Sequence, residues 1–361
     1  MKDIRSLNLN ELKELMVSLN EKPFRAAQIF EWLHVKLASD YEEMTNISLG
    51  LRNRLKEEYA LNSLEIVRVL KDEEDGTCKF LFKTRDNNVI ESVLMKYDYG
   101  NSVCISSQVG CRMGCSFCAS TIGGRIRNLT AGEMLAQIYA IQKYDGQRVS
   151  HIVVMGTGEP FDNFEEFVRF YELITDEKGF KLSGRNVTVS TCGIVEKIRE
   201  LADMEPALTL AISLHAPSDE LRKKIMPIAN KYRIEDILAA CDYFFEKTGR
   251  RVSFEYSLIS GVNDTGECAN MLSGILKGKN CHVNLIPINP VKERDYRKSD
   301  SSSVKAFKFI LEKNGINATI RRGMGKTIDA ACGQLRRSYI TSGGDTGAVV
   351  CEDRCGSDEA D

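Results

Sequence analysis

The sequence predicts an α/β fold, a partial (β/α)6 barrel preceded by a small α+β accessory domain. The first observation behind this prediction is that short apolar runs alternate with helical patterns over most of the chain, which indicates a parallel sheet. The second is that the N-terminal part has another order, with helices first and closely spaced strands after them. The third is composition: the 361 residues are 43% hydrophobic and 28% charged, which suits one large and one small globular domain.

The accessory domain is predicted over residues 1–95. Apolar residues recur at helical spacing near its start, namely Leu9, Leu12, Leu15, Met16 and Leu19. From Leu64 onward the period changes to that of short strands separated by Asp, Asn and Gly turns. We therefore expect an antiparallel meander of three strands, at 66–70, 78–82 and 89–95.

The barrel domain is predicted over residues 96–340. Its strands are expected at 103–106, 152–155, 187–190, 208–214, 252–256 and 283–287. Helices are expected between them at 130–144, 163–175, 234–248, 264–277 and 302–314. Six units fall short of an eight-fold barrel, so we expect it to be open on one side, with its site at the carboxyl ends of the strands. Residues 341–361 are rich in Gly, Ser and Asp and are expected to form a disordered tail.

Charge and hydropathy exclude two classes of protein. With 49 basic and 51 acidic residues the net charge is −2, so the chain is not a nucleic-acid binder that depends on its overall charge. No stretch reaches the roughly 18 apolar residues of a membrane helix, and the N-terminus lacks a signal-peptide core, so we expect a cytoplasmic protein without membrane contact. The twelve cysteines are then expected to be reduced.

Any bound RNA must therefore meet local basic patches, each of which alone is more simply explained as a solvated face. The candidates are Arg125 and Arg127; Arg222, Lys223, Lys224, Lys231 and Arg233; Lys292, Arg294, Arg297 and Lys298; and Arg321, Arg322 and Lys326. These patches and the N-terminal domain form the expected RNA platform, with no contact residue assigned.

The sharpest motif is a group of three cysteines, Cys111, Cys115 and Cys118, spaced by three and two residues after the first barrel strand. Closed zinc sites use four ligands and usually C-x2-C pairs. A [4Fe–4S] cluster has four irons, so three thiolates leave one iron open to a small molecule. Gly114 permits a tight backbone wrap, and Phe117 can shield the cluster from water.

This motif resembles the signature of the radical S-adenosylmethionine (SAM) superfamily, Cys-x-x-x-Cys-x-aromatic-Cys after the first strand. The resemblance implies that Cys111, Cys115 and Cys118 hold one [4Fe–4S] cluster. It further implies that the open iron binds the amino and carboxylate groups of SAM, and that one electron cleaves SAM to a deoxyadenosyl radical. An electron donor such as flavodoxin or ferredoxin is then required.

Two further cysteines narrow the resemblance, Cys104 in Val-Cys-Ile-Ser-Ser-Gln-Val-Gly and Cys332 in Ile-Asp-Ala-Ala-Cys-Gly-Gln-Leu. They resemble the RlmN/Cfr family of RNA methyltransferases, and the likeness runs from the N-terminus to about residue 340. The family's substrate carbon, which lies between two ring nitrogens of adenine, is electrophilic, so polar attack on a sulfonium methyl fails and a radical carbon is needed.

The resemblance implies a mechanism that consumes two SAM molecules per methylation. Cys332 takes a methyl group from the first, and the radical from the second strips a hydrogen from that S-methyl group. The resulting methylene radical adds to the base, and Cys104 releases the RNA by forming a disulfide with Cys332, which external thiols reduce. By position, Glu91 matches the family's proton acceptor.

Strand-end residues match the family's cofactor contacts. Glycines in such a turn allow backbone contact, and a glutamate can pair with the methionine ammonium. The matched residues are Gly158, Glu159, Ser190, Ser213, Leu214, His215 and Asn289. Thr157 stands where related chains often have Met, a minor departure because backbone contact would survive it. For His215, a hydrogen-bonded structural role is as good an interpretation as direct chemistry.

The remaining thiols and imidazoles need no special role. Packing is the default for the cysteines Cys78, Cys192, Cys241, Cys268 and Cys281, and Cys351 and Cys355 form an incidental or weak metal pair in the tail. The histidines interpreted as structural are His34, His151 and His282.

The implied substrates are an adenine of 23S rRNA and an adenine beside the anticodon of some tRNAs, each unstacked into a pocket, and a monomer is expected. The close rival is the Cfr branch, which methylates position 8 of the same rRNA adenine. A second alternative is a non-catalytic RNA-binding protein with a structural metal, which would be colourless. A third is a radical enzyme acting on peptides, which would not need the paired thiols.

Overall fold

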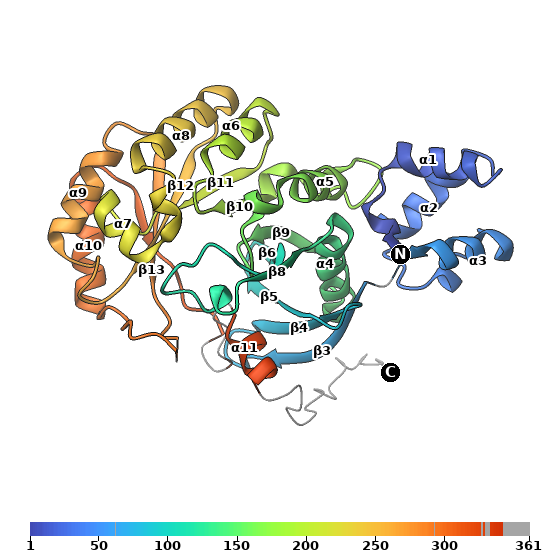
Figure 1. Ribbon diagram of the computed structural model, residues 1–361, viewed down its shortest axis with the longest axis horizontal. Coiled ribbons are helices and arrows are strands. Elements are labelled where there is room, and N and C mark those ends of the chain that lie inside the picture. Colours follow the sequence, from blue (N-terminus) through green and yellow to red (C-terminus); the bar gives the residue numbers. More distant parts are fainter. Residues whose placement is uncertain (62, 292, 326–327, 329–332, 342–361) are drawn as a thin grey trace, which may run out of the picture.

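The computed structural model describes residues 1–61, 63–291, 293–325, 328 and 333–341. One ten-stranded sheet runs through the molecule, with helices α1–α3 at one end and α9 and α10 at the other (Figure 1). The expected tail was 341–361: Thr341 instead ends helix α11, and residues 342–361 lie outside the described residues. The candidates Cys332, Lys292, Lys326, Cys351 and Cys355 lie outside them as well. Within them, no helix is both long and apolar enough to cross a lipid bilayer.

The N-terminal region is helical, as its apolar spacing predicts, with α1 at Leu9–Ser18, α2 at Arg25–His34 and α3 at Leu49–Glu58. Asn8 caps α1, since its side chain accepts from the Glu11 N–H while the Glu11 carboxylate accepts from the Asn8 N–H. The short strands β1 (Lys2–Asp3) and β2 (Tyr59–Ala60) pair with each other. Arg169 of the barrel forms an ion pair with Glu11 at 2.6 Å and so ties this region to the rest.

The sheet has an antiparallel part and a parallel part. Strands β3 (Leu64–Lys71), β4 (Cys78–Thr84) and β5 (Val89–Tyr97) form the expected meander, and β5 pairs antiparallel with β6 (Gly100–Cys104). The sheet is therefore continuous across residues 95 and 96, and the division of domains there stays a prediction.

From β6 onward all neighbours are parallel, in the order β6, β9, β10, β11, β12, β13, β14. Their bounds are Val149–Val154 for β9, Val187–Thr191 for β10, Thr209–Ser213 for β11, Val252–Leu258 for β12, Cys281–Pro287 for β13 and Ala318–Ile320 for β14. Every predicted barrel strand is present, and β14 is an addition, too short at three residues for its period to be seen in the sequence. The sheet with its covering helices forms the predicted partial barrel.

The helices that follow the strands cover the sheet. They are α4 (Ala131–Asp145), α5 (Phe164–Thr175), α6 (Val195–Asp203), α7 (Asp219–Ile225), α8 (Ile234–Thr248), α9 (Gly266–Leu276), α10 (Ser301–Lys313) and α11 (Gln334–Thr341). The five helices expected from periodicity are all found, whereas α6, α7 and α11 were not expected. The core lies between sheet and helices, where Val103, Val189 and Phe254 are at most 1% exposed, as buried parallel strands require.

Candidate functional site

A cavity of about 410 Å³ opens at the carboxyl ends of the parallel strands. This is where a barrel places its functional residues, because the loops after successive strands meet at that end. The predicted site residues that line it are Cys104, Cys111, Cys115, Cys118, Gly158, Glu159, Ser190, Ser213, His215 and Asn289. Among the matched cofactor residues, Leu214 alone does not line the cavity: its side chain is 0% exposed, and its N–H donates to the Glu255 carbonyl.

The three cysteines lie on a loop held between two short antiparallel strands, β7 (Gln108–Gly110) and β8 (Arg125–Asn128). Gly110 has φ of 78°, and a Cβ there would lie 2.1 Å from the Gly124 carbonyl oxygen, so only glycine fits. The Cys111 N–H donates to that carbonyl at 3.1 Å. Thr121 donates to the carbonyls of Cys115 and Cys118 at 3.1 and 2.9 Å, which fixes the loop's curvature.

The thiols of Cys111 and Cys115 are largely shielded from water. Burial raises the pKa of Cys111 to about 12 and raises the pKa of Cys115 further. Each of these thiols also feels the charge of the neighbouring Cys118. Metal ligation requires thiolates, so a bound metal must displace these protons.

Glu159 provides a buried carboxylate beside the cysteines. Its Oε1 accepts from the Phe161 N–H at 3.0 Å and its Oε2 from the Cys192 N–H at 2.7 Å, which sets its orientation. Burial raises the pKa of Glu159, and these hydrogen bonds oppose the rise. A cation brought into the cavity would stabilise the ionised form, so Glu159 is suited to pair with an ammonium group.

The ends of β10 and β11 contribute polar groups to the next part of the wall. The hydroxyl groups of Ser190 and Ser213 lie 3.2 Å apart. His215 accepts from the Ser257 N–H through Nδ1 at 2.9 Å, and burial lowers the pKa of His215 to about 3. The imidazole is therefore neutral with its proton on Nε2, and its ring contacts Phe117 edge-on at 5.0 Å between centroids.

The predicted catalytic residues are only partly brought together. Cys104, at the end of β6, is buried and lines the cavity, whereas Glu91 on β5 is buried outside the cavity lining. Glu91 forms an ion pair with Lys79 at 3.3 Å and accepts from the backbone N–H groups of Gly333, at 2.8 Å, and Arg336. Gly333 directly follows Cys332 in the sequence, but Cys332 lies outside the described residues, so its pairing with Cys104 stays a prediction.

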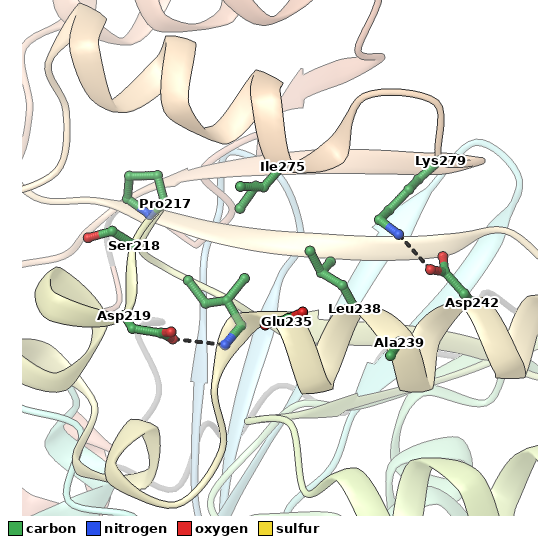
Figure 2. A pocket seen from close by; sticks show the side chains of 10 residues that line it. Pro217, Ser218, Asp219, Glu235, Leu238, Ala239, Asp242, Ile275 and Lys279 are labelled. Atoms are coloured by element: carbon green, nitrogen blue, oxygen red, sulfur yellow. Dashed lines mark hydrogen bonds and ion pairs between the residues drawn. The ribbon is translucent and has the colours of Figure 1, made fainter.

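A second cavity of about 500 Å³ lies between α8, α9 and the loop before α7. Lys279 pairs with Asp242, as Figure 2 shows, and their charged atoms lie 2.6 Å apart. Asp219 accepts from the Ile234 N–H. No predicted site residue lines it, and its charged groups already have partners. The cavity at the strand ends is therefore the candidate site.

Comparison with known proteins agrees with this geometry. Residues 105–270 match the radical SAM superfamily, and residues 2–61 match the N-terminal domain of ribosomal RNA large subunit methyltransferases. A probable dual-specificity RNA methyltransferase RlmN of Lachnoclostridium phytofermentans is 61% identical over 337 residues, which cover 93% of this chain and 95% of the relative. The chain belongs to the RlmN family. A second such relative, from Lachnospira eligens, is 60% identical over 340 residues, covering 94% of this chain and 97% of its own length.

A solved structure gives the same result for the RlmN fold. The radical SAM methyltransferase from Sphaerobacter thermophilus superposes with a TM-score of 0.89 at 43% identity, covering 92% of this chain and 99% of that one. The chain is therefore a radical SAM methyltransferase, and its cofactors are a [4Fe–4S] cluster and SAM, as predicted.

The residues at the RlmN-family site fit these cofactors. Three thiols line one cavity, and among the residues that the structure describes no three His, Cys, Asp or Glu side chains converge on a single metal ion. That arrangement suits a cluster, in which each thiolate binds its own iron, better than a zinc site. The buried carboxylate of Glu159 suits an ammonium group, and the same cavity holds the hydroxyl groups of Ser190 and Ser213 and the Nε2–H of His215.

The sequence interpretation missed several parts of the RlmN-family site. Cys192, interpreted as a packing residue, lines the cavity, and Glu255 on β12 does as well. For Cys192 the sequence did offer a signal, because this residue directly follows the end of a predicted strand. Glu255 lies inside an apolar strand, and the sequence pattern alone does not predict that its side chain is buried.

The basic patches are corrected in part. Arg125 pairs with Asp162 at 2.7 Å, and Arg127 pairs with Asp86 and Glu133, so their charges are already compensated. Arg222 is 0% exposed and cannot belong to a surface patch. Three other members are exposed and line the mouth of the cavity, namely Lys298, Arg321 and Arg322.

Proposed function

We propose that this enzyme methylates carbon 2 of a specific adenine in 23S rRNA and of an adenine near the anticodon in some tRNAs. The proposal rests on the full-length match, at 61% identity, to a relative named as a dual-specificity RNA methyltransferase. The cavity supports it, since it combines a three-thiol cluster loop with the additional cysteine Cys104. The exposed cations at its mouth suit a polyanionic substrate.

Bound at this site, the cluster and SAM supply a carbon-centred radical. The chain's own part is to orient SAM and keep water out. Glu159 pairs with the methionine ammonium, and the N–H groups of Phe161 and Cys192 hold its carboxylate in place. His215 acts as a neutral donor through Nε2–H, because its Nδ1 is occupied by the Ser257 N–H. Phe117, which belongs to the cluster loop, packs its ring edge-on against His215.

In this proposal Cys332 carries the methyl group, Cys104 releases the product through a disulfide with Cys332, and Glu91 accepts the proton that leaves the adenine carbon. Both oxygens of Glu91 are occupied in the described conformation, by the N–H groups of Gly333 and Arg336 and by Lys79. Glu91 must therefore exchange one of these partners before it can take a proton. A flavodoxin or ferredoxin supplies the electron, and the enzyme acts as a monomer.

The test is to incubate the reconstituted enzyme with RNA and SAM labelled with deuterium on the methyl group. A methyl group that has passed through Cys332 exchanges one deuterium for hydrogen, and mass spectrometry of the nuclease-digested RNA measures this. Full retention of deuterium would contradict the methyl-cysteine route. Mapping the product gives the position, and a methyl at position 8 would replace our proposal with the Cfr-type reaction.

Two variants separate the roles of the paired cysteines. Cys332→Ala should abolish methyl transfer, whereas Cys104→Ala should accumulate RNA covalently joined to protein, seen on a denaturing gel. Cys268→Ala, on α9 and outside the cavity lining, is the matched control and should retain activity. Equal turnover of Cys332→Ala and the control would overturn the proposed role of Cys332.

A further inference from the structure

Arg222 on α7 is a fully buried cation with no salt-bridge partner among the residues that the structure describes. Its side chain is 0% exposed, and its guanidinium donates only to backbone carbonyls. The Cys192 carbonyl accepts at 2.6 Å and the Leu214 carbonyl at 3.1 Å, with longer bonds of 3.4 Å to Tyr232 and Ser213. Among the ion pairs of the described residues, none includes Arg222.

Such a burial is costly unless something compensates the charge. Carbonyl dipoles replace part of the lost hydration, but an unpaired buried charge still costs several kcal/mol. Burial lowers the pKa of Arg222, yet a guanidinium starts so far above neutrality that it stays charged. Asp219 on the same helix attracts this charge but forms no salt bridge with Arg222, because its oxygens bind the Ile234 N–H and Arg233. The fold therefore retains a buried positive charge that no salt bridge of the described residues compensates.

Arg222 lies directly behind the cluster loop. At the C-terminal end of its helix, the Ile225 carbonyl accepts from the Ser116 N–H at 2.9 Å, so α7 packs on the loop between Cys115 and Cys118. On the other side, Arg222 holds the carbonyl of Cys192, a residue that lines the same cavity as the cluster cysteines.

We propose that Arg222 is the counter-charge of the [4Fe–4S] cluster and raises its reduction potential. A cluster held by three thiolates is anionic, and the one electron that arrives from a reduced donor makes it more so. A fixed positive charge in a medium of low dielectric constant stabilises the reduced form more than the oxidised form. No bond forms or breaks at Arg222, and the proposal does not depend on which RNA position is methylated.

The test is a redox titration of the reconstituted protein with dithionite, followed by electron paramagnetic resonance of the reduced cluster. Arg222→Gln removes the charge but keeps hydrogen-bond donors, whereas Arg222→Lys keeps the charge. At a fixed potential the ratio of reduced to oxidised cluster should fall about tenfold in the Gln variant, or about 59 mV for a one-electron couple. The Lys variant should stay within about twofold of the parent.

Arg250→Gln is the matched control. Arg250 donates to the Leu208 carbonyl at 2.7 Å, next to the opposite end of β11 from Leu214, so its loss removes a similar bond far from the cluster. The reduction potential of the cluster in the Arg250→Gln variant should equal that of the parent. If Arg222 only fastens strand ends, the Gln and Lys variants will keep the parent's potential or shift equally, and either result overturns the proposal.

Arg222→Met, which leaves no unsatisfied donor, is a second neutral variant in case the Gln variant does not fold. Iron and sulfide content are measured for each protein. Loss of the cluster from both neutral variants but not from Arg222→Lys would support the proposal, because the charge is then needed to hold an anionic cluster. Loss of the cluster from all three variants would overturn it, since hydrogen-bond geometry would then be decisive.

Discussion

Two fully buried cations, Lys79 on β4 and Arg222 on α7, are accommodated in opposite ways. Both side chains are 0% exposed. Lys79, in the antiparallel part of the sheet, lies 3.3 Å from the carboxylate of Glu91. Arg222, at the carboxyl ends of the parallel strands, contacts only carbonyl groups. The antiparallel region compensates this buried charge with its own carboxylate, whereas in our proposal the parallel region relies on the charge of a cofactor.

The same contrast extends to other groups at the strand ends. Burial raises the pKa values of Glu159, Cys111 and Cys115, and each of these groups becomes better stabilised when an ammonium or iron arrives. His34 shows a third solution, because it is buried as a neutral imidazole bonded to the Tyr139 hydroxyl at 2.8 Å.

The largest effect is expected at Lys79. Lys79→Met leaves the Glu91 carboxylate buried without its cation, which should lower the free energy of unfolding by about 3–5 kcal/mol in urea denaturation. Lys36→Met is the control. Lys36 pairs with Glu31 at the surface, where both side chains are more than a third exposed. Its replacement should lower the free energy of unfolding by less than about 1 kcal/mol. A loss as small as the control's would mean that the Lys79–Glu91 pair does not compensate itself.

A smaller effect is expected from the acidification of His34. Burial lowers the pKa of His34 to about 3 from 6.5, so between these values the unfolded state binds a proton that the folded state does not. Stability is therefore complete above about pH 6.5 and falls as the pH drops, by about 2 kcal/mol between pH 7.5 and pH 5 for this group. In urea unfolding, the free energy of unfolding of the His34→Gln variant should change less over that pH range than that of the parent. Parallel profiles would show that His34 can be charged in the folded protein.

Much of the site could be predicted because its residues stand at recognisable places along the chain. Cys111, Cys115 and Cys118 are close in sequence, and Glu159 and Ser190 follow apolar runs that end where parallel strands end. Ten predicted site residues accordingly line one cavity. Periodicity likewise located every barrel strand except β14, because parallel strands buried on both faces are short and continuously apolar.

What could not be predicted depends on contacts between distant segments. Arg222 stands in the run Arg-Lys-Lys, which locally resembles an exposed basic face, and only the carbonyls of two strand ends reveal its burial. Glu91 and Gly333 bond across 242 residues, a contact that no local pattern encodes. The length of β14 gave no period, and β5 joins the barrel sheet through a pairing that the sequence pattern does not specify.

The smallest effect is expected for Arg222→Met in the protein without its cluster. If the cluster is the counter-charge, Arg222→Met in the cluster-free protein loses the hydrogen bonds to the Cys192 and Leu214 carbonyls but also removes an uncompensated buried charge. These effects oppose each other, so the free energy of unfolding should stay within about 1 kcal/mol of the parent. In the reconstituted protein the same change should be destabilising, because the anionic cluster then loses its buried partner. Urea unfolding of both forms under anaerobic conditions measures the difference. If the cluster-free and the reconstituted protein lose the same free energy of unfolding, the carbonyl groups alone stabilise the charge of Arg222. The contrast between Lys79 and Arg222 would then be wrong.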